Sequence, residues 1–436
     1  MINPDWRFWA PSGEISPGGP SKWYIFDTDQ RRMIVVTMDG EQEEEEVAIE
    51  HLKRHVEDLD PGVFEIYVSD DGDLISTSSN PEDDRMEAVN YPLLSSFANP
   101  ADVKTVRRQH MRELERLSPE VDLVEYTDPA MDEARPEKLV FKYICLSQSI
   151  VFRWDEMQIS MHLPPHPNIV PLDRVVIEEL EGRPVVIGFT TRFVPGGTVC
   201  DNIARVFKLK YLKQLIKVID DLNLKYGIEH QDVAPRNLLV DEENDNLLLF
   251  DFNYSGPVGG RPRPNGGLRY EEVRNDVKGV IFTLYEIITQ DAHFRRVQHA
   301  QQNSDDVYKL ETWTQHPDVK LDHPVADYRS VLNEWVEARK TGPKITVYTE
   351  APEYIEWPDL GQPPGDYVVN LGDLPVGHPL LTPMWRYERK SAWQAGMDVI
   401  CWERPSQESI KEGIHILATG EVVEEDELSS VTEMKH

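Results

Sequence analysis

Hydrophobic and polar residues alternate along the N-terminal part of the chain in a way that predicts a small mixed module. Residues 22–40 hold two apolar runs around a polar turn, and residues 63–78 repeat this arrangement around Asp-Asp-Gly, so each stretch predicts a β-hairpin. Between them, residues 44–59 carry apolar positions at helical spacing and predict an amphipathic helix. We therefore expect an α+β module over residues 1–90, followed by a linker over residues 91–103.

The central part of the chain predicts a longer run of elements. Residues 98–117 predict a helix, and residues 137–144 predict an apolar strand. Leucines and isoleucines recur at helical spacing in residues 209–228, which predict a buried helix. Residues 237–252 hold two apolar runs around a polar turn and predict a hairpin, and residues 276–288 predict a further helix.

The polar residues around the predicted hairpin have the spacing of a phosphotransfer site. Asp232 stands five residues before Asn237, and Asp251 follows the second apolar run. Phosphotransfer needs one carboxylate at the acceptor hydroxyl, while an amide oxygen and a second carboxylate hold Mg²⁺ against the phosphates. A hairpin would carry both metal ligands on a rigid support.

These residues resemble the motifs of the protein kinase family. His230-Gln231-Asp232 resembles the His-Arg-Asp of that family, and Asp251-Phe252-Asn253 resembles its Asp-Phe-Gly. Other landmarks follow in the family's order: Lys142 in EKLVFKYI, Glu156, the HPNIV turn from His166, the FTTRFV stretch and Asp276 in DVKGV. The resemblance implies a bilobal α+β fold over residues 104–345, with a β-rich N-lobe and a helical C-lobe, in which Asp276 bonds the catalytic-loop backbone.

The resemblance also implies a role for each matching residue. Asp232 is expected to orient the acceptor hydroxyl and take its proton, and Asn237 and Asp251 to ligate Mg²⁺. Lys142 is expected to contact the α- and β-phosphates of ATP, with Glu156 as its partner. The remaining candidates are Thr191 as gatekeeper, Arg192 to Val194 as the linker facing adenine, and Arg236, which either reaches the γ-phosphate or pairs with nearby acids.

The chain departs from the family's pattern in four places. Residues 116–144 contain no Gly, so the loop that normally covers the phosphates is missing, although a hairpin can still form there. Asn253 replaces a glycine, and we expect the turn to survive because Asn tolerates left-handed backbone. Gln231 replaces an Arg that binds a loop phosphate, so we expect no switching by phosphorylation of the loop. Ala234 replaces the Lys of Ser/Thr kinases, which leaves the acceptor type open.

Three functions compete on these residues. The first is an ATP- and Mg²⁺-dependent phosphotransferase, most simply a protein kinase that acts on protein hydroxyls. The second is a pseudokinase scaffold with weak or no nucleotide binding, which the missing Gly-rich loop favours. The third is a small-molecule kinase of the aminoglycoside-phosphotransferase type, in which an Asp and an Asn are also five residues apart.

Composition narrows the partners and the compartment. The net charge is −33, with acidic runs at residues 41–46 and 421–427. This balance argues against nucleic acid and against anionic membranes as partners, because both need a basic surface. The three Cys residues have no metal-ligand spacing, and the N-terminus has no signal pattern. We therefore expect an intracellular protein, in the cytoplasm or the nucleus.

The C-terminal part, residues 346–436, is rich in Pro, Trp and Tyr. We expect an extension that wraps on the C-lobe and ends in an acidic tail from about residue 420. Its aromatic residues, or those of residues 1–90, either pack on the lobes or form a docking surface for a protein partner. These flanking parts resemble kinase-like proteins of filamentous fungi.

Overall fold

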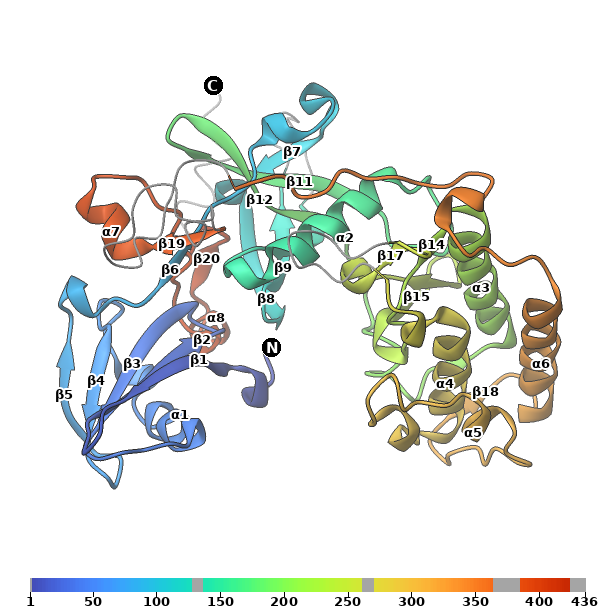
Figure 1. The fold of residues 1–436 in the computed structure, drawn as a ribbon, viewed down its shortest axis with the longest axis horizontal. Coiled ribbons are helices and arrows are strands. Elements are labelled where there is room, and N and C mark those ends of the chain that lie inside the picture. The colour runs from blue at the N-terminus through green and yellow to red at the C-terminus, as the bar shows by residue number, and fades with distance from the viewer. Residues whose placement is uncertain (1, 128–135, 261–269, 364–384, 424–436) are drawn as a thin grey trace. The chain divides into compact units, whose positions relative to one another are not determined.

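The computed structural model describes residues 2–127, 136–260, 270–363 and 385–423. It combines helices and sheets, which agrees with the expected α+β class (Figure 1). The chain divides into two compact units. The first comprises Met1–Ile150, Asp173–Thr191 and Gly361–His436, and the second comprises Val151–Leu172 and Arg192–Leu360. The predicted two-lobe fold is a statement about how two units are placed relative to one another, and it stays a prediction.

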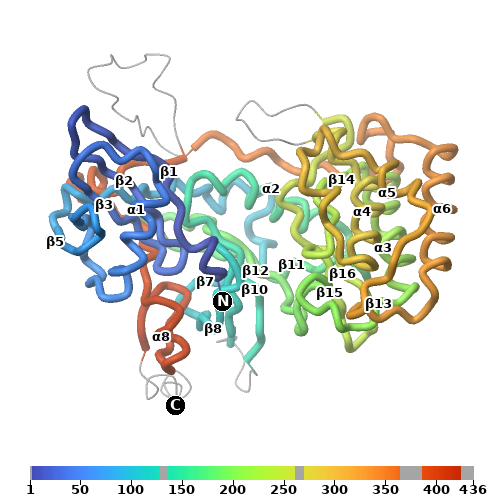
Figure 2. Tube along the Cα trace, turned by 90° about the horizontal axis from the view of Figure 1, so that it is seen from below, coloured from blue at the N-terminus to red at the C-terminus, as the bar shows by residue number. Residues whose placement is uncertain are grey.

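The first unit begins with a five-stranded sheet whose strands follow chain order. They are β1 (Phe8–Ile15), β2 (Ser21–Asp27), β3 (Arg32–Met38), β4 (Glu65–Val68) and β5 (Leu74–Ser78). The helix α1 (Glu45–Lys53) lies beside this sheet (Figure 2) and buries Ala48 and Leu52 in its apolar core. The two predicted hairpins and the predicted helix are confirmed. The pattern does not predict β1, because Ala10 is its one buried residue and Pro11 interrupts it.

A second sheet of the first unit has eight strands, in the order β21-β20-β8-β9-β10-β12-β11-β7. They are β7 (Thr105–Arg107), β8 (Met111–Ser118), β9 (Val121–Tyr126), β10 (Glu137–Tyr143), β11 (Leu172–Leu180), β12 (Arg183–Arg192), β20 (His415–Leu417) and β21 (Val422–Val423). The helix predicted over residues 98–117 is wrong, since this stretch forms β7 and β8. The pattern misleads because two buried residues of β8 are Glu113 and Arg116, so apolar residues do not mark its buried side.

The C-terminal residues divide between the two units. Tyr348 N donates to Val258 O at 2.8 Å, so this part packs on the second unit as expected. Residues 385–423 instead belong to the first unit, where β19 (Arg386–Glu388) pairs with β6 (Glu87–Val89) and β20 pairs with β8. The expectation that the whole extension wraps on the C-lobe is therefore wrong. Its short helices are α7 (Arg389–Gln394) and α8 (Gln407–Lys411). The expected acidic tail lies almost wholly outside the described residues.

A buried set of alternating charges, called here the arginine network, ties the C-terminal residues to both sheets of the first unit. Its members are Arg31, Arg116, Arg404, Asp29, Glu113 and Asp122. Arg31 Nη2 lies 2.6 Å from Asp122 Oδ1, and Arg116 Nη1 lies 2.5 Å from Asp29 Oδ1. Arg404 pairs with Glu113. Because buried charges are tolerated only when paired, these three chain segments depend on one another.

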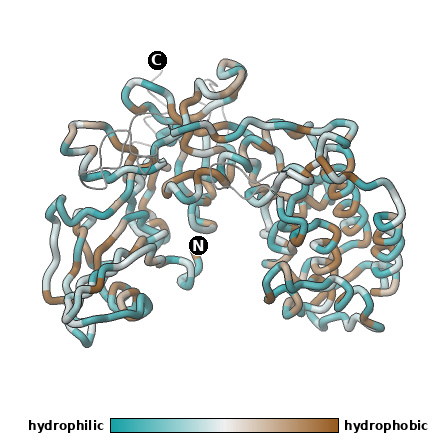
Figure 3. Tube along the Cα trace, viewed as in Figure 1, coloured by the Kyte–Doolittle hydropathy of each residue, from teal (hydrophilic) through white to brown (hydrophobic). Residues whose placement is uncertain are grey.

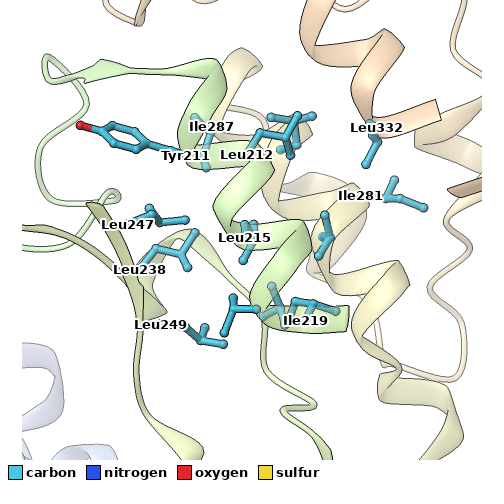
Figure 4. Close-up of a cluster of buried hydrophobic side chains, with 14 of the residues drawn as sticks. Tyr211, Leu212, Leu215, Ile219, Leu238, Leu247, Leu249, Ile281, Ile287 and Leu332 are labelled. Carbon is cyan, nitrogen blue, oxygen red and sulfur yellow. The ribbon is translucent and has the colours of Figure 1, made fainter. Parts of the chain in front are cut away.

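The second unit is built around helix α3 (Leu209–Asp220). Figure 4 shows Leu212, Leu215 and Ile219 of this helix among leucines of the β15–β16 hairpin and residues of α4 and α6. These elements are α4 (Asp276–Thr289), α6 (Val325–Thr341), β15 (Leu238–Asp241) and β16 (Asn246–Leu249). The predicted buried helix, the predicted hairpin and the helix at 276–288 are confirmed. The helical period succeeds here because the buried residues of α3 are all hydrophobic or aromatic and most of those of α4 are apolar. Hydrophobic residues recur along both helices (Figure 3).

Smaller elements complete the second unit. They are α2 (Ile150–His162), α5 (Asp305–Tyr308), and the strand pairs β13 (Val206–Phe207) with β18 (Lys320–Leu321) and β14 (Ile228–Glu229) with β17 (Gly256–Pro257). Among the described residues, no helix has the length and apolar character needed to cross a membrane.

Candidate active site

Asp276 fixes the backbone of the loop that contains Asp232. Asp276 is 1% exposed and begins α4. Its Oδ2 accepts the N–H of His230 at 2.8 Å, and its Oδ1 accepts the N–H of Gln231 at 2.8 Å. Asn223 Nδ2 donates to the same carboxylate at 2.8 Å. The predicted bond from Asp276 to the loop backbone is confirmed, and the loop is anchored to a helix of the core.

Gln231 joins the two ends of the segment that follows Asp251. Its Nε2 donates to Tyr254 O at 2.7 Å, and its Oε1 accepts the N–H of Glu271 at 2.5 Å. Gln231 has φ of 63°, a left-handed backbone conformation that costs free energy in a residue other than glycine. The side-chain amide of Gln231 therefore holds the two ends of this segment by two neutral hydrogen bonds. In the family's pattern, a cation and a phosphate hold the corresponding segment.

Asp232 and Asn237 are in direct contact. Asn237 Nδ2 donates to Asp232 Oδ2 at 2.8 Å and to the carbonyl oxygen of Asp232 at 2.8 Å. Asp232 is 8% exposed and Asn237 is 3% exposed, so both side chains are held in place. Since the Asn237 amide nitrogen is used by Asp232, its Oδ1 is the atom that can ligate a cation.

Arg236 also pairs with Asp232. Its Nη2 lies 2.5 Å from Asp232 Oδ1, and its side chain is 56% exposed. The structure thus shows the pairing with a nearby acid that we considered for this residue. A contact with a γ-phosphate stays a prediction.

Asp251 lies next to this pair through backbone hydrogen bonds. Phe250 N donates to Asn237 O at 3.2 Å, and His230 Nε2 lies 2.9 Å from Phe250 O. Asp251 itself has φ of 68° and ψ of 68°. We expected Asn253 to carry the left-handed conformation, but the positive φ falls on Asp251 and not on Asn253. Such backbone strain is concentrated at functional sites, where the surrounding structure maintains it.

The glycine-rich loop of the family is replaced by a tight turn. β8 and β9 form a hairpin, which the sequence allowed here, joined by Pro119 and Glu120, with Ser118 opposite Val121. Glu120 has φ of 58°, and its Oε1 accepts hydrogen bonds from Cys145 N at 2.9 Å, Leu146 N at 3.1 Å and Ser149 Oγ at 2.8 Å. These bonds fix the turn to the segment after β10. A turn of two residues offers far fewer backbone N–H groups to a phosphate than a glycine-rich loop does.

The remaining predicted residues are divided between the units. Lys142 lies on β10 opposite Val121 and is 5% exposed, and Thr191 is the last residue of the segment Asp173–Thr191 of the same unit. Glu156 lies on α2 in the second unit, where Arg153 Nη1 is 3.0 Å from its Oε2. The predicted pairing of Lys142 with Glu156 would join a residue of the first unit to a residue of the second, and it stays a prediction.

The expected adenine linker, residues 192–194, lies in the second unit. Arg192 Nη2 is 2.6 Å from Asp241 Oδ2, and the pKa of Asp241 is lowered by hydrogen bonds from Asn244 and from Arg192. Val194 is 4% exposed and packs in a small apolar cluster with Leu248. The linker is therefore anchored to the β15–β16 hairpin on both sides of residue 193.

Sequence reasoning missed the residues that hold the carbonyl of Val233, next to Asp232. Thr283 Oγ1 donates to Val233 O at 2.9 Å, and Arg295 Nη1 donates to the same oxygen at 3.1 Å. Thr283 sits inside an apolar helix, and a polar residue in such a place is a weak signal of a buried contact. Among the described residues, no group of three or more His, Cys, Asp or Glu is placed to hold a metal ion by itself.

Comparison with known proteins points to kinases over a limited stretch. No family model matches the chain. It is 36% identical over 102 residues to CBL-interacting protein kinase 15 of Oryza sativa subsp. japonica, which covers 22% of each chain. It is 36% identical over 124 residues to CBL-interacting serine/threonine-protein kinase 24 of Arabidopsis thaliana, covering 27% of this chain and 26% of that protein. The chain thus spans about a quarter or less of the length of these relatives, and over that stretch it is related to protein kinases.

Proposed function

We propose that the protein is an ATP- and Mg²⁺-dependent phosphotransferase, most simply a protein kinase that transfers the γ-phosphate to a protein hydroxyl. The observation that carries this proposal is the contact of Asn237 with Asp232 in a loop whose backbone is fixed by Asp276. A scaffold with no polar chemistry to perform has no need of a carboxylate and an amide held together beside a left-handed Asp251. The relation to protein kinases supports the same conclusion.

The residues present fit a magnesium nucleotide. Mg²⁺ in nucleotide sites is held by one or two protein oxygens together with phosphate oxygens, and Asn237 Oδ1 and the Asp251 carboxylate are such donors. Bound Mg²⁺–ATP would supply the electrophilic phosphorus. Asp232 would accept the proton of the attacking hydroxyl, because its carboxylate is oriented by Asn237 and is partly open to solvent. Lys142 would bind phosphate oxygens.

The adenine side of the proposed site is assigned to the linker residues. Thr191, Arg192 and Val194 would border the base, and the bond from Arg192 to Asp241 would keep the linker in place. Glu156 would orient Lys142. Arg236 would leave Asp232 when a substrate enters, because the Arg236 side chain is 56% exposed and its guanidinium can be solvated by water instead.

A scaffold that binds nucleotide weakly or not at all is the second candidate. The turn at Glu120 favours it, because three hydrogen bonds hold that carboxylate where the family's pattern has a flexible, glycine-rich cover. In this candidate the loop around Asp232 serves only to order the second unit.

The test is the thermal stabilisation of the full chain by ATP with and without Mg²⁺. Ligand at about a hundredfold its dissociation constant stabilises by about 2.7 kcal/mol, which raises Tm by roughly 5 to 10 °C for a domain of this size. We expect a Mg²⁺-dependent rise that Asp251→Asn abolishes. Asp306→Asn, an equal change of charge on the exposed side of α5, should keep the full rise. No rise at millimolar ATP would exclude the phosphotransferase and leave the scaffold.

A further inference from the structure

A cavity of about 590 Å³ lies within the second unit and borders the candidate active site through Asn223, which bonds Asp276. Its walls include Asn223 after α3, Glu229 on β14, Ile281 on α4, Tyr308 on α5 and Arg339 on α6. Its volume is in the range that holds a small molecule or one long side chain. None of the residues assigned to nucleotide or acceptor lines it.

Glu229 is the unusual residue of this cavity. It is 8% exposed, and its Oε2 has no hydrogen-bond partner among the described residues. A buried carboxylate without a partner is costly when ionised, so such a group is paired with a cation or stays protonated. Its neighbours make the cost larger, since Asp276 and Glu272 add negative charge.

The positive groups around the cavity do not relieve Glu229. Arg339 is the cation that acts on it, but its Nη1 lies 3.1 Å from Asp220 Oδ1 and its Nη2 donates to Asn223 Oδ1 at 2.9 Å. Lys340 Nζ bonds Glu337 Oε1 at 2.8 Å. The charged and titratable residues that complete the lining are Asp305, Lys344, Tyr270 and Tyr308. Among the described residues, Glu229 Oε2 is therefore left without a bonded cation. The ring of Tyr270 offers an aromatic face suited to a cation, whereas Lys340 Nζ already lies over the ring of Tyr308 at 5.0 Å.

We propose that this cavity is a binding site for an alkyl guanidinium or alkylammonium group, which forms an ion pair with Glu229. A free amine and a basic side chain of another protein both carry this chemistry. The site does not require nucleotide binding, so it stands apart from the proposed function. The charge of the occupant completes the pairing that the chain leaves open at Oε2.

Calorimetric titration of the full chain with agmatine tests the proposal. Burial raises the pKa of Glu229 to about 8, and Asp276 adds to this effect. Binding of a cation near neutral pH must therefore release about one proton from Glu229. The released proton is measured by repeating the titration in two buffers with different ionisation enthalpies. We expect Glu229→Gln to weaken binding by about 30-fold or more, the loss typical of a buried charge pair, and to abolish proton release.

Glu334→Gln is the matched control. It makes the same change of charge on an exposed residue of α6 that does not line the cavity, so it should leave both affinity and proton release unchanged. This control separates binding in the cavity from the general attraction of cations to a chain of net charge −33.

The outcomes distinguish the two sources of the cation. A second titration uses an acetylated, amidated Gly-Arg-Gly peptide. Agmatine binding alone indicates a free amine, and tighter binding of the peptide indicates a basic side chain of a protein partner. The proposal is overturned if neither probe binds at millimolar concentration, or if wild-type protein binds them without releasing a proton. The second result needs no variant, so it decides the matter even if Glu229→Gln does not fold. Loss of the ATP-induced stabilisation would leave this site untouched.

Discussion

Arg236 and Asp232 form an ion pair across the loop, with Nη2 2.5 Å from Oδ1, while Asn237 holds the other carboxylate oxygen of Asp232 at 2.8 Å. The two partners differ in burial, because Arg236 is 56% exposed and Asn237 is 3% exposed. Asn237 therefore fixes the carboxylate, and Arg236 covers the oxygen that faces solvent. Opening of the Arg236 pair would free that oxygen for an acceptor hydroxyl.

Removal of the Arg236 charge should leave the protein stable. Because the Arg236 end of the pair is exposed and Asp232 keeps its bond to Asn237, Arg236→Gln should change the free energy of unfolding in urea by less than about 1 kcal/mol. Asn237→Leu, which removes the buried partner and leaves Asp232 without its amide, should cost about 1–3 kcal/mol. A cost for Arg236→Gln equal to that for Asn237→Leu would contradict this division of roles.

The contact of Gln231 with Tyr254 and Glu271 predicts a specific defect in Gln231→Glu. The carboxylate can still accept the N–H of Glu271, but it has no donor for Tyr254 O, which then faces a negative charge. We expect a loss of about 1–3 kcal/mol in the free energy of unfolding and faster hydrogen exchange at residues 254–256. Gln301→Glu, an exposed change of the same kind, is the control and should show neither effect.

The neutral clamp at Gln231 also predicts that phosphorylation does not switch this segment. Tyr254→Phe and Tyr270→Phe should leave ATP turnover unchanged, because Gln231 bonds backbone atoms and no phosphate is needed to hold them. Ser255→Ala should also retain turnover, at a cost of about 1 kcal/mol for the hydrogen bond from Ser255 Oγ to His230 O. A large loss of turnover in either tyrosine variant would refute the prediction.

The sequence predicts best those elements whose buried side is apolar. Leu212, Leu215 and Ile219 recur at helical spacing, and α3 is found where they predict it. The same reasoning fails at β8, because its buried residues Glu113 and Arg116 are satisfied by ion pairs with distant segments. The spacing of Asp232 and Asn237 was sufficient to predict a shared loop. The clamp at Gln231 was not predictable, since its partners lie 23 and 40 residues away and are backbone atoms.

The arginine network predicts that the C-terminal residues are part of the core of the first unit. Arg404→Met would leave Glu113 with one fewer cation in a fully buried place, and loss of one partner from a buried pair costs about 3–5 kcal/mol. Chemical denaturation of the full chain measures this. Arg107→Met removes an exposed pair with Glu179 in the same unit and should cost less than about 1 kcal/mol. Equal costs would mean that residues 385–423 are attached only loosely.

Glu229 predicts a pH dependence of stability that its amide variant lacks. In the folded chain burial raises its pKa to about 8, whereas a Glu in an unfolded chain has a pKa of about 4.3. Between these values the unfolded chain binds fewer protons than the folded chain at this residue, so ionisation favours unfolding and stability falls as pH rises. The fall is at most about 1.4 kcal/mol per pH unit, and it ends once pH passes the folded pKa. Glu229→Gln cannot ionise, so its free energy of unfolding relative to wild type should increase from about pH 5 to about pH 8 and then stay level.

Urea denaturation across this range measures the difference, and Glu334→Gln, whose side chain is exposed, should follow wild type throughout. A constant difference between Glu229→Gln and wild type would mean that Glu229 is already ionised at low pH and has a counterion within the chain.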